Sequence, residues 1–163
     1  VLTDTNGFKN DNVDKNTFVM VSEMMDIGVN IYNLRKKSLT EMTMPQYELM
    51  KLALNRLEFF YNGMIAFSFI TKDDMERLNA QVGDHEGLVE LGRDIVGVEV
   101  SIFMREDEGY CVSFRSNETV NVCEIAKIFG GNGHSRASGA KLEKSFDEAK
   151  NLVIEETVKA MKR

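Results

Sequence analysis

Two alternating runs in the second half of the chain constrain its fold more than any other feature. Apolar residues occupy every second position over 98–104 and again over 110–114, and an acidic segment, 106–109, separates the runs. A period of two is typical of strands that are buried on one face. The turn between them predicts a β-hairpin. Any fold for this chain must therefore contain a sheet.

Further strands and helices are predicted around this hairpin. The apolar run 65–70 is too short for a helix and predicts a strand, and 137–142 predicts another. Helices are expected over residues 73–81, 88–95 and 122–129, and after Ser145. The pairs Thr71 with Asp74 and Ser145 with Glu148 are typical of helix N-termini. Strands and helices in this order predict an α/β fold with a mixed β-sheet flanked by helices.

The residues before the first predicted strand have a helical pattern. Apolar residues recur at helical spacing after Phe18, and Gly28 is placed to end that helix. A short helix is expected near 31–37, and Pro45 begins a longer helix whose apolar stripe ends near Gly63. The members of the stripe are Tyr47, Met50, Leu54, Leu57 and Phe60.

The composition excludes several classes of protein. The chain has 163 residues, 43% of them hydrophobic and 28% charged, with a net charge of −6, so it is not suited to many phosphate contacts along duplex nucleic acid. A small anionic ligand remains compatible. No apolar run has the length of a membrane span, and the first residues lack the pattern of a secretory signal. The two cysteines lack the spacing of a metal or redox pair. We expect a cytoplasmic protein with reduced thiols and no membrane partner.

The segment 129–139 is the main candidate site. It contains four of the twelve glycines, together with His134 and Arg136. The N–H groups of glycine-rich backbone can approach an anion closely, and both side chains can bind a phosphate. Arg115, at the end of the second hairpin strand, is placed to project toward a ligand. A plain turn between a helix and a strand explains the same glycines, and the residues alone leave both interpretations open.

Two other polar segments are weaker candidates. Asp84, His85 and Glu86 follow one another, which suits a metal site or acid–base chemistry, but a solvated loop is the simpler interpretation. Asp4, between two threonines, could be a metal-binding carboxylate, although an aspartate near a chain end is more often a turn residue.

Several short motifs follow one another in an order that is more specific than any of them alone. They are Thr3-Asp4-Thr5-Asn6-Gly7-Phe8, Asp84-His85-Glu86-Gly87-Leu88-Val89, Arg115-Ser116-Asn117, Val120-Asn121-Val122, Phe129-Gly130-Gly131-Asn132-Gly133-His134 and Ala137-Ser138-Gly139. In this order they resemble the DHH-family phosphoesterases that carry a DHHA1 domain. Asn132 stands where the family has a glycine, and Ser138 stands where it has an alanine.

The resemblance implies a parent enzyme of two lobes. Residues 1–62 would be the C-terminal remnant of a DHH domain with a linker helix, and 63–163 would be a DHHA1 domain that binds the substrate. Two divalent cations, commonly Mn²⁺, would be held by DHH motifs that are absent from this chain. Asp4 would be the one metal ligand here, so the chain would carry no other catalytic residue.

The resemblance also implies a set of substrate-binding residues. Arg115 would neutralise a phosphate, His134 would hydrogen-bond a phosphate or a base, and the N–H groups from Gly131 to Gly133 would form a cradle for the same anion. The full set is Arg115, Ser116, Gly130, Gly131, Asn132, Gly133, His134 and Arg136.

Among the activities of the family, hydrolysis of short oligonucleotides and of 3′-phosphoadenosine 5′-phosphate fits best. Phosphodiesterases that act on cyclic di-AMP or its linear product pApA are an alternative, and a non-catalytic DHHA1 module that binds RNA or a nucleotide is another. The expected partners are a short oligonucleotide or small nucleotide and the missing N-terminal DHH domain, and a homodimer is left open.

Overall fold

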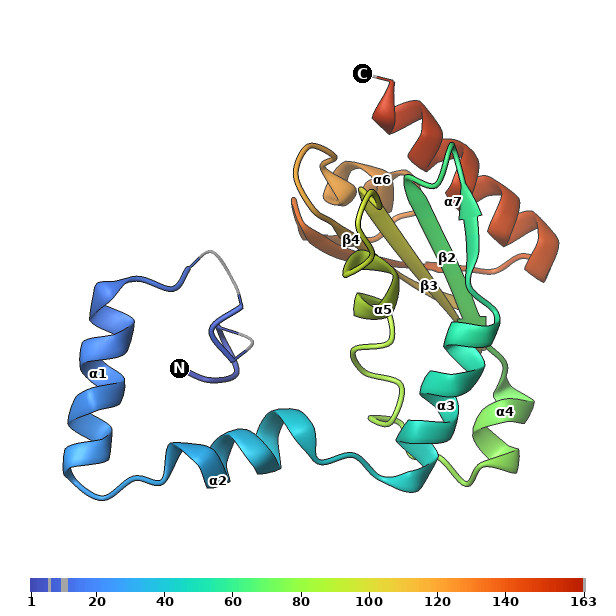
Figure 1. Ribbon diagram of the computed structural model, residues 1–163. Helices are drawn as coiled ribbons and strands as arrows, with labels where there is room; N and C mark the ends of the chain where they lie inside the picture. Colours follow the sequence, from blue (N-terminus) through green and yellow to red (C-terminus); the bar gives the residue numbers. More distant parts are fainter. Residues whose placement is uncertain (6, 10–11, 163) are drawn as a thin grey trace. The chain divides into compact units, whose positions relative to one another are not determined.

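The computed structural model describes residues 1–5, 7–9 and 12–162. It forms two compact units, Val1–Thr43 and Met44–Arg163, each of which is described by itself. The second unit contains a six-stranded sheet with helices on both faces (Figure 1), so the predicted α/β class is confirmed. Asn6, a member of the first motif above, lies outside the described residues.

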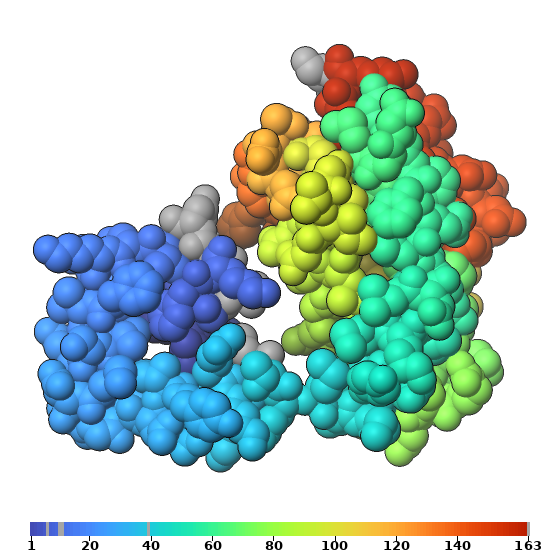
Figure 2. Space-filling model, in the orientation of Figure 1, coloured from blue at the N-terminus to red at the C-terminus, as the bar shows by residue number. Residues whose placement is uncertain are grey.

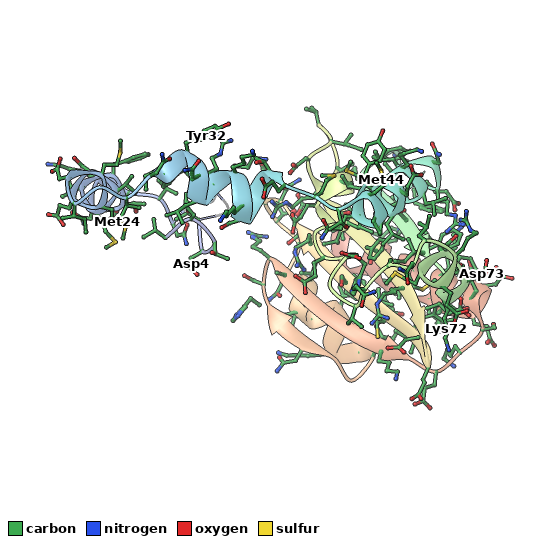
Figure 3. All side chains as sticks on the ribbon, turned by 90° about the horizontal axis from the view of Figure 1, so that it is seen from below. Asp4, Met24, Tyr32, Met44, Lys72 and Asp73 are labelled. Atoms are coloured by element: carbon green, nitrogen blue, oxygen red, sulfur yellow. The ribbon has the colours of Figure 1, made fainter. Side chains whose placement is uncertain are left out.

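The first unit consists of turns and short helices. Its helices are α1 (Lys15–Asp26), α2 (Ile31–Arg35) and the π-helical turn η1 (Lys36–Thr40). Asp14 caps α1 through its bond with Thr17, and Gly28, at φ 90°, follows the end of the helix as predicted. No residue of α1 or α2 is buried, and Tyr32 stands away from α2 (Figure 3). Apolar helix faces of this kind are normally covered by another part of a protein.

Six strands form the sheet of the second unit in the order β1-β2-β3-β4-β6-β5. They are β1 (Glu58–Phe60), β2 (Ile65–Ile70), β3 (Val100–Asp107), β4 (Gly109–Ser116), β5 (Asn132–His134) and β6 (Ala137–Leu142). β2 and β3 are parallel, and each other neighbouring pair is antiparallel. The sheet is therefore mixed, and the long segment between β2 and β3 provides the crossover that a parallel pair requires.

Five helices cover parts of the two faces. They are α3 (Met44–Asn55), α4 (Lys72–Arg77), α5 (Glu90–Arg93), α6 (Val122–Ile128) and α7 (Phe146–Met161). α3 and α5 lie on one side of β2 and β3, and α6 and α7 lie on the other (Figure 1). Thr71 with Asp74 begins α4, and Ser145 with Glu148 begins α7, so both predicted capping boxes are confirmed.

The larger hydrophobic core lies between the sheet and helices α6 and α7. Alternate residues of the hairpin strands, among them Ile102 and Phe114, are buried there with Ile125 of α6 and Val153 of α7. The alternating pattern thus predicted correctly which hairpin residues face this core, but β3 is not half-buried as predicted, because Ser101 and Phe103 on its other face are buried too. At the hairpin turn, Gly109 has a φ of 88°, and a Cβ there would lie 2.6 Å from the carbonyl oxygen of Leu142. Only glycine fits such a turn without strain.

A smaller core lies on the opposite face and covers β2 and β3. Leu49 and Ala53 of α3 pack there against Ile70, Leu88 and Phe103. In the space-filling view the yellow-green segment that precedes β3 lies beside the teal residues of α3 (Figure 2). This core covers β2 and β3 but does not extend over β4, β6 and β5. The part of the face that it leaves uncovered is the site described below.

The helix expected to reach Gly63 was predicted too long. α3 ends at Asn55, and Glu58–Phe60 form strand β1 against β2. A short apolar run fits both periods, and pairing with the neighbouring strand decides between them. The turn that follows places Tyr61 and Asn62 at positive φ, which a continuing helix does not allow.

The apolar stripe predicted for the same helix was only partly correct, since Met50 and Phe60 pack against the cores but other members do not. Tyr47 and Leu54 are exposed, whereas Leu49 and Ala53 are fully buried against the sheet. Which turn of a helix meets a sheet depends on the direction from which the helix approaches, and the sequence alone does not give that direction.

The helix predicted over 73–81 is shorter as well. α4 ends at Arg77, and Asn79 has a φ of 50°.

Cys111 lies on β4 and Cys123 on α6, and both are free thiols as predicted. The predicted division after residue 62 falls inside the second unit, because α3 and β1 pack with the sheet.

Candidate functional site on the open half of the sheet

Within the second unit, the described residues leave the face of the sheet opposite α6 and α7 uncovered over strands β4, β6 and β5. Cross-strand partners point to the same side of a sheet. The register places on this side Cys111, Ser113, Arg115, Ala137, Gly139, Lys141, Asn132 and His134. All of them are partly or fully exposed. We call this surface the open half. Its small and polar residues suit a bound ligand better than a packed helix.

The strand register brings Arg115 and His134 into one row of the open half. Arg115 is opposite Ala137 across β4 and β6, and Ala137 is opposite His134 across β6 and β5. Neighbouring strands are about 4.8 Å apart, so the two Cα atoms are separated by roughly 10 Å. Two residues from different motifs therefore point to the same side with one strand between them, which is a spacing that a single nucleotide can bridge.

Arg115 is held by a carboxylate that the sequence did not indicate. Its Nε donates to Glu90 Oε1 at 2.8 Å, and its Nη1 donates to the carbonyl oxygen of Phe114 at 3.0 Å. Both side chains of the ion pair are 28% exposed. A guanidinium has five N–H donors in a planar fork, so these bonds fix its orientation and leave further donors for an anion. Glu90 belongs to α5, and nothing in its sequence position connects it with β4.

Two of the predicted binding residues, Ser116 and Arg136, donate hydrogen bonds to backbone carbonyl groups. The Ser116 hydroxyl is buried and donates to the carbonyl oxygen of Val120 at 2.6 Å. Arg136 donates to the same oxygen at 3.2 Å and also to the carbonyl oxygen of Glu118. Both side chains therefore hold the turn after β4. The Ser116 hydroxyl thus has a structural role, whereas Arg136 keeps further N–H donors, so its contact with a substrate stays a prediction.

A second carboxylate, also missed in the sequence, holds the other side of this turn. The Glu99 carboxylate accepts hydrogen bonds from three successive backbone N–H groups. The shortest distances are 3.1 Å from Glu118, 2.8 Å from Thr119 and 2.8 Å from Val120. Burial by itself raises the pKa of Glu99, but the three N–H donors outweigh it and hold the pKa below its ordinary value. The turn next to Arg115 is thus fixed from both sides.

The glycine run does not form the cradle of amides that was predicted. The N–H groups of Gly130 and Gly131 donate to Lys127 O and Ala126 O, at 3.0 and 2.9 Å, and complete the end of α6. The N–H of Gly133 donates to the side-chain oxygen of Asn132 at 2.8 Å. Helix ends leave carbonyl groups in need of donors, and here the glycine amides supply them.

The glycines instead allow two strands to approach closely. Residues 132–134, expected as a loop, form the edge strand β5 beside β6. A Cβ at Gly131 would overlap the backbone oxygen of Gly139, and a Cβ at Gly133 would lie 2.5 Å from Ser138 Cα. The motif therefore places His134 by means of close backbone packing. His134 itself is exposed at the end of β5.

The segment 84–86 behaves mainly as a structured loop. Asp84 accepts the backbone N–H of Gln81 at 2.7 Å. His85 is partly buried, and its Nδ1 has no hydrogen-bond partner among the described residues. Burial and the nearby charge of Arg105 lower the pKa of His85 below its ordinary value. A neutral imidazole is therefore expected there at neutral pH.

The residues that the structure describes do not form a metal site by themselves. Asp4 lies 3.3 Å from the amino group of Val1, with its side chain mostly exposed (Figure 3). Over residues 1–5, 7–9 and 12–162 no three histidine, cysteine or acidic side chains are grouped so that they could hold a metal ion. A metal ion needs several ligands, and Asp4 can contribute at most one of them. The described residues therefore do not fit a resident metal.

In the same part of the chain, no helix is both long and apolar enough to cross a bilayer.

An α/β domain that displays an arginine and a histidine on an uncovered sheet face is suited to bind a small anion. Residues 62–162 match the model of the DHHA1 domain family, and the chain belongs to that family, as the resemblance predicted.

Two curated relatives show how far the similarity extends. The chain is 30% identical over 158 residues to the bifunctional oligoribonuclease and PAP phosphatase NrnA of Thermus thermophilus, an alignment that covers 95% of this chain and 47% of that protein. It is 33% identical over 88 residues to the protein of the same name from Bacillus subtilis, which covers 53% of this chain and 28% of that protein. The chain spans about half the length, or less, of the curated relatives it matches.

Two solved structures share the fold. An exopolyphosphatase-related protein from Bacteroides fragilis matches with a TM-score of 0.91 at 26% identity, over 97% of this chain and 47% of that one. A pGpG-specific phosphodiesterase, PggH from Vibrio cholerae, matches with a TM-score of 0.54 at 11% identity, over 91% of this chain and 53% of that one. The second likeness concerns the fold alone.

Proposed function

We propose that this chain is the substrate-binding part of a metal-dependent DHH-family phosphoesterase that hydrolyses short oligonucleotides, 3′-phosphoadenosine 5′-phosphate, or both. The observation that carries the proposal is the row on the open half in which Arg115 and His134 face the same side. The names of the relatives, oligoribonuclease and PAP phosphatase, support this substrate class. A guanidinium held at its Nε offers its outer N–H groups to a phosphate, and an imidazole about 10 Å away can reach the base or the next phosphate.

The cleavage step belongs, in this proposal, to groups outside the chain. The chain spans about half of its relatives, and the other half is where we place the DHH domain with its divalent cations, Mn²⁺ in the first instance. Asp4 is the one residue here that we propose as a ligand to them. A cytoplasmic location and a homodimer remain predictions of the same kind.

The binding role can be tested with the dinucleotide pApA and the 163-residue chain. Arg115→Ala should weaken binding about tenfold or more, because a charge-assisted hydrogen bond to phosphate is lost. His134→Ala should weaken it less. The matched control is Arg77→Ala, since Arg77 is an exposed arginine on α4 that is paired with Asp74. The affinities are measured by titration calorimetry. If the Arg115 and Arg77 variants bound pApA equally well, the open half would not be the binding site.

The enzymatic role needs the chain joined to its expected DHH half. With Mn²⁺ present, that protein should release mononucleotides from a dinucleotide, and Arg115→Ala should raise KM more than it lowers kcat. A protein that binds pApA through Arg115 but hydrolyses neither it nor 3′-phosphoadenosine 5′-phosphate would instead be a non-catalytic nucleotide-binding module.

A further inference from the structure

Glu90 lies between two arginines at the border of the open half. Its Oε1 accepts from Arg115 Nε at 2.8 Å, and its Oε2 lies 2.8 Å from Arg93 Nε. Oε2 is buried, and among the described residues it accepts no hydrogen bond of regular geometry. One carboxylate thus contacts two guanidinium groups, and the three side chains together carry a single positive charge.

All three side chains remain partly accessible. Glu90 and Arg115 are each 28% exposed, and Arg93 is 24% exposed. An anion bound to Arg115 would therefore lie near the negative charge of Glu90 in a partly desolvated environment, where charges interact more strongly than in bulk water.

We propose that Glu90 tunes the charge preference of the phosphate site, so that a doubly charged phosphomonoester gains less over a singly charged phosphodiester than it would beside two unpaired arginines. This inference rests on the proposed function, in which Arg115 binds a substrate phosphate. Coulomb energy is proportional to the charge of the ligand, so the carboxylate disfavours a dianion twice as strongly, in free energy, as a monoanion. Glu90 is thereby a specificity residue that reduces the advantage of terminal phosphomonoesters over internal phosphodiesters.

The experiment compares two ligands that differ by one charge. Adenosine 5′-monophosphate is close to a dianion at pH 7.5, because the second pKa of a phosphate monoester is about 6, whereas its methyl ester is a monoanion. Their dissociation constants are measured by titration calorimetry with the 163-residue chain and with Glu90→Gln. The amide oxygen of glutamine can still accept from Arg115 Nε, so the variant removes the charge and preserves the shape.

The expected result is a gain in affinity that depends on ligand charge. At physiological salt, Glu90→Gln should improve binding of the methyl ester about threefold and of the monophosphate about ninefold, since the logarithm of the gain scales with charge. Arg93→Gln should shift the preference in the opposite direction. The control is Glu124→Gln on α6, whose exposed carboxylate is paired with Lys127, and it should leave the ratio of the two affinities unchanged.

Other outcomes separate this inference from the proposed function. If Glu90→Gln weakened both ligands equally, Glu90 would only position Arg115 and the charge preference would be disproved. If both ligands bound in an Arg115-dependent manner but with an unchanged ratio, the inference would fail while the proposed function survived. If neither ligand bound, the proposed function would fail and the inference with it.

Discussion

Two arginine–carboxylate pairs in the second unit differ in how completely their charges are satisfied. In the covered part of the sheet, Arg56 binds Asp74 through two N–H···O bonds, and the side chain of Asp74 is only 4% exposed. The same carboxylate accepts from the backbone and the hydroxyl of Thr71, each at 2.8 Å. At the border of the open half, Arg115 and Glu90 share one hydrogen bond, and both remain 28% exposed.

The difference shows which pair stabilises the fold and which is available to a ligand. Burial by itself raises the pKa of Asp74, but the bonds from Arg56 and Thr71 outweigh it and hold the pKa well below its ordinary value. Each oxygen of Asp74 is occupied by protein donors. Arg115 is as exposed as Arg56, at 28%, but its partner Glu90 is also 28% exposed, and Arg115 uses only part of its donor set.

The largest effect is expected from truncating the buried carboxylate. Asp74→Ala should lower the free energy of unfolding by about 3 kcal/mol or more, because it leaves Arg56 without its partner and removes the capping box of α4. Glu90→Ala is the matched variant. It should lower the free energy of unfolding by less than about 1 kcal/mol, as is usual for partly exposed ion pairs. Urea unfolding of both variants measures the contrast. Similar losses for the two would mean that the pairs have the same role.

A smaller effect is expected within the glycine run. Gly131→Ala should destabilise the chain by about 2 kcal/mol, since its Cβ would overlap the backbone of β6 and force the strands apart. Gly130→Ala should cost only about 1 kcal/mol, because Gly130 has a φ of 72° but no atom within 4 Å of its Cβ position. We further expect Gly131→Ala, and not Gly130→Ala, to weaken nucleotide binding through a displaced His134. Thermal unfolding combined with pApA titration distinguishes the two positions.

The smallest effect is the loss of the Asp74 bonds in acid. A pKa that is lowered on folding adds stability above the ordinary value of 3.8, and this stability is lost as the pH falls through that value toward the folded pKa. One such group should remove about 1 kcal/mol between about pH 5 and pH 3. The difference between the unfolding free energies of the wild type and Asp74→Asn should therefore shrink by about this amount over the range. A constant difference would show that the carboxylate is not held ionised by its partners.

Local signals were sufficient for most of the fold. The hairpin, strand β2 and the capping boxes at Thr71 and Ser145 were correctly predicted, because each depends on residues that are close in sequence. The failures occurred where a distant segment decides. β1 and β5 exist because β2 and β6 lie beside them, and the buried positions of α3, Leu49 and Ala53, depend on how that helix meets the sheet.

The sequence by itself determined the class of the fold, the family and the two side chains, Arg115 and His134, on which the proposed site depends. The tertiary structure alone decided that the glycine amides are occupied, that Ser116 and Arg136 hold a turn, and that Glu90 contacts Arg115. The physical reason is that periodicity and capping act over a few residues, whereas strand register and ion pairs join residues that only folding brings together.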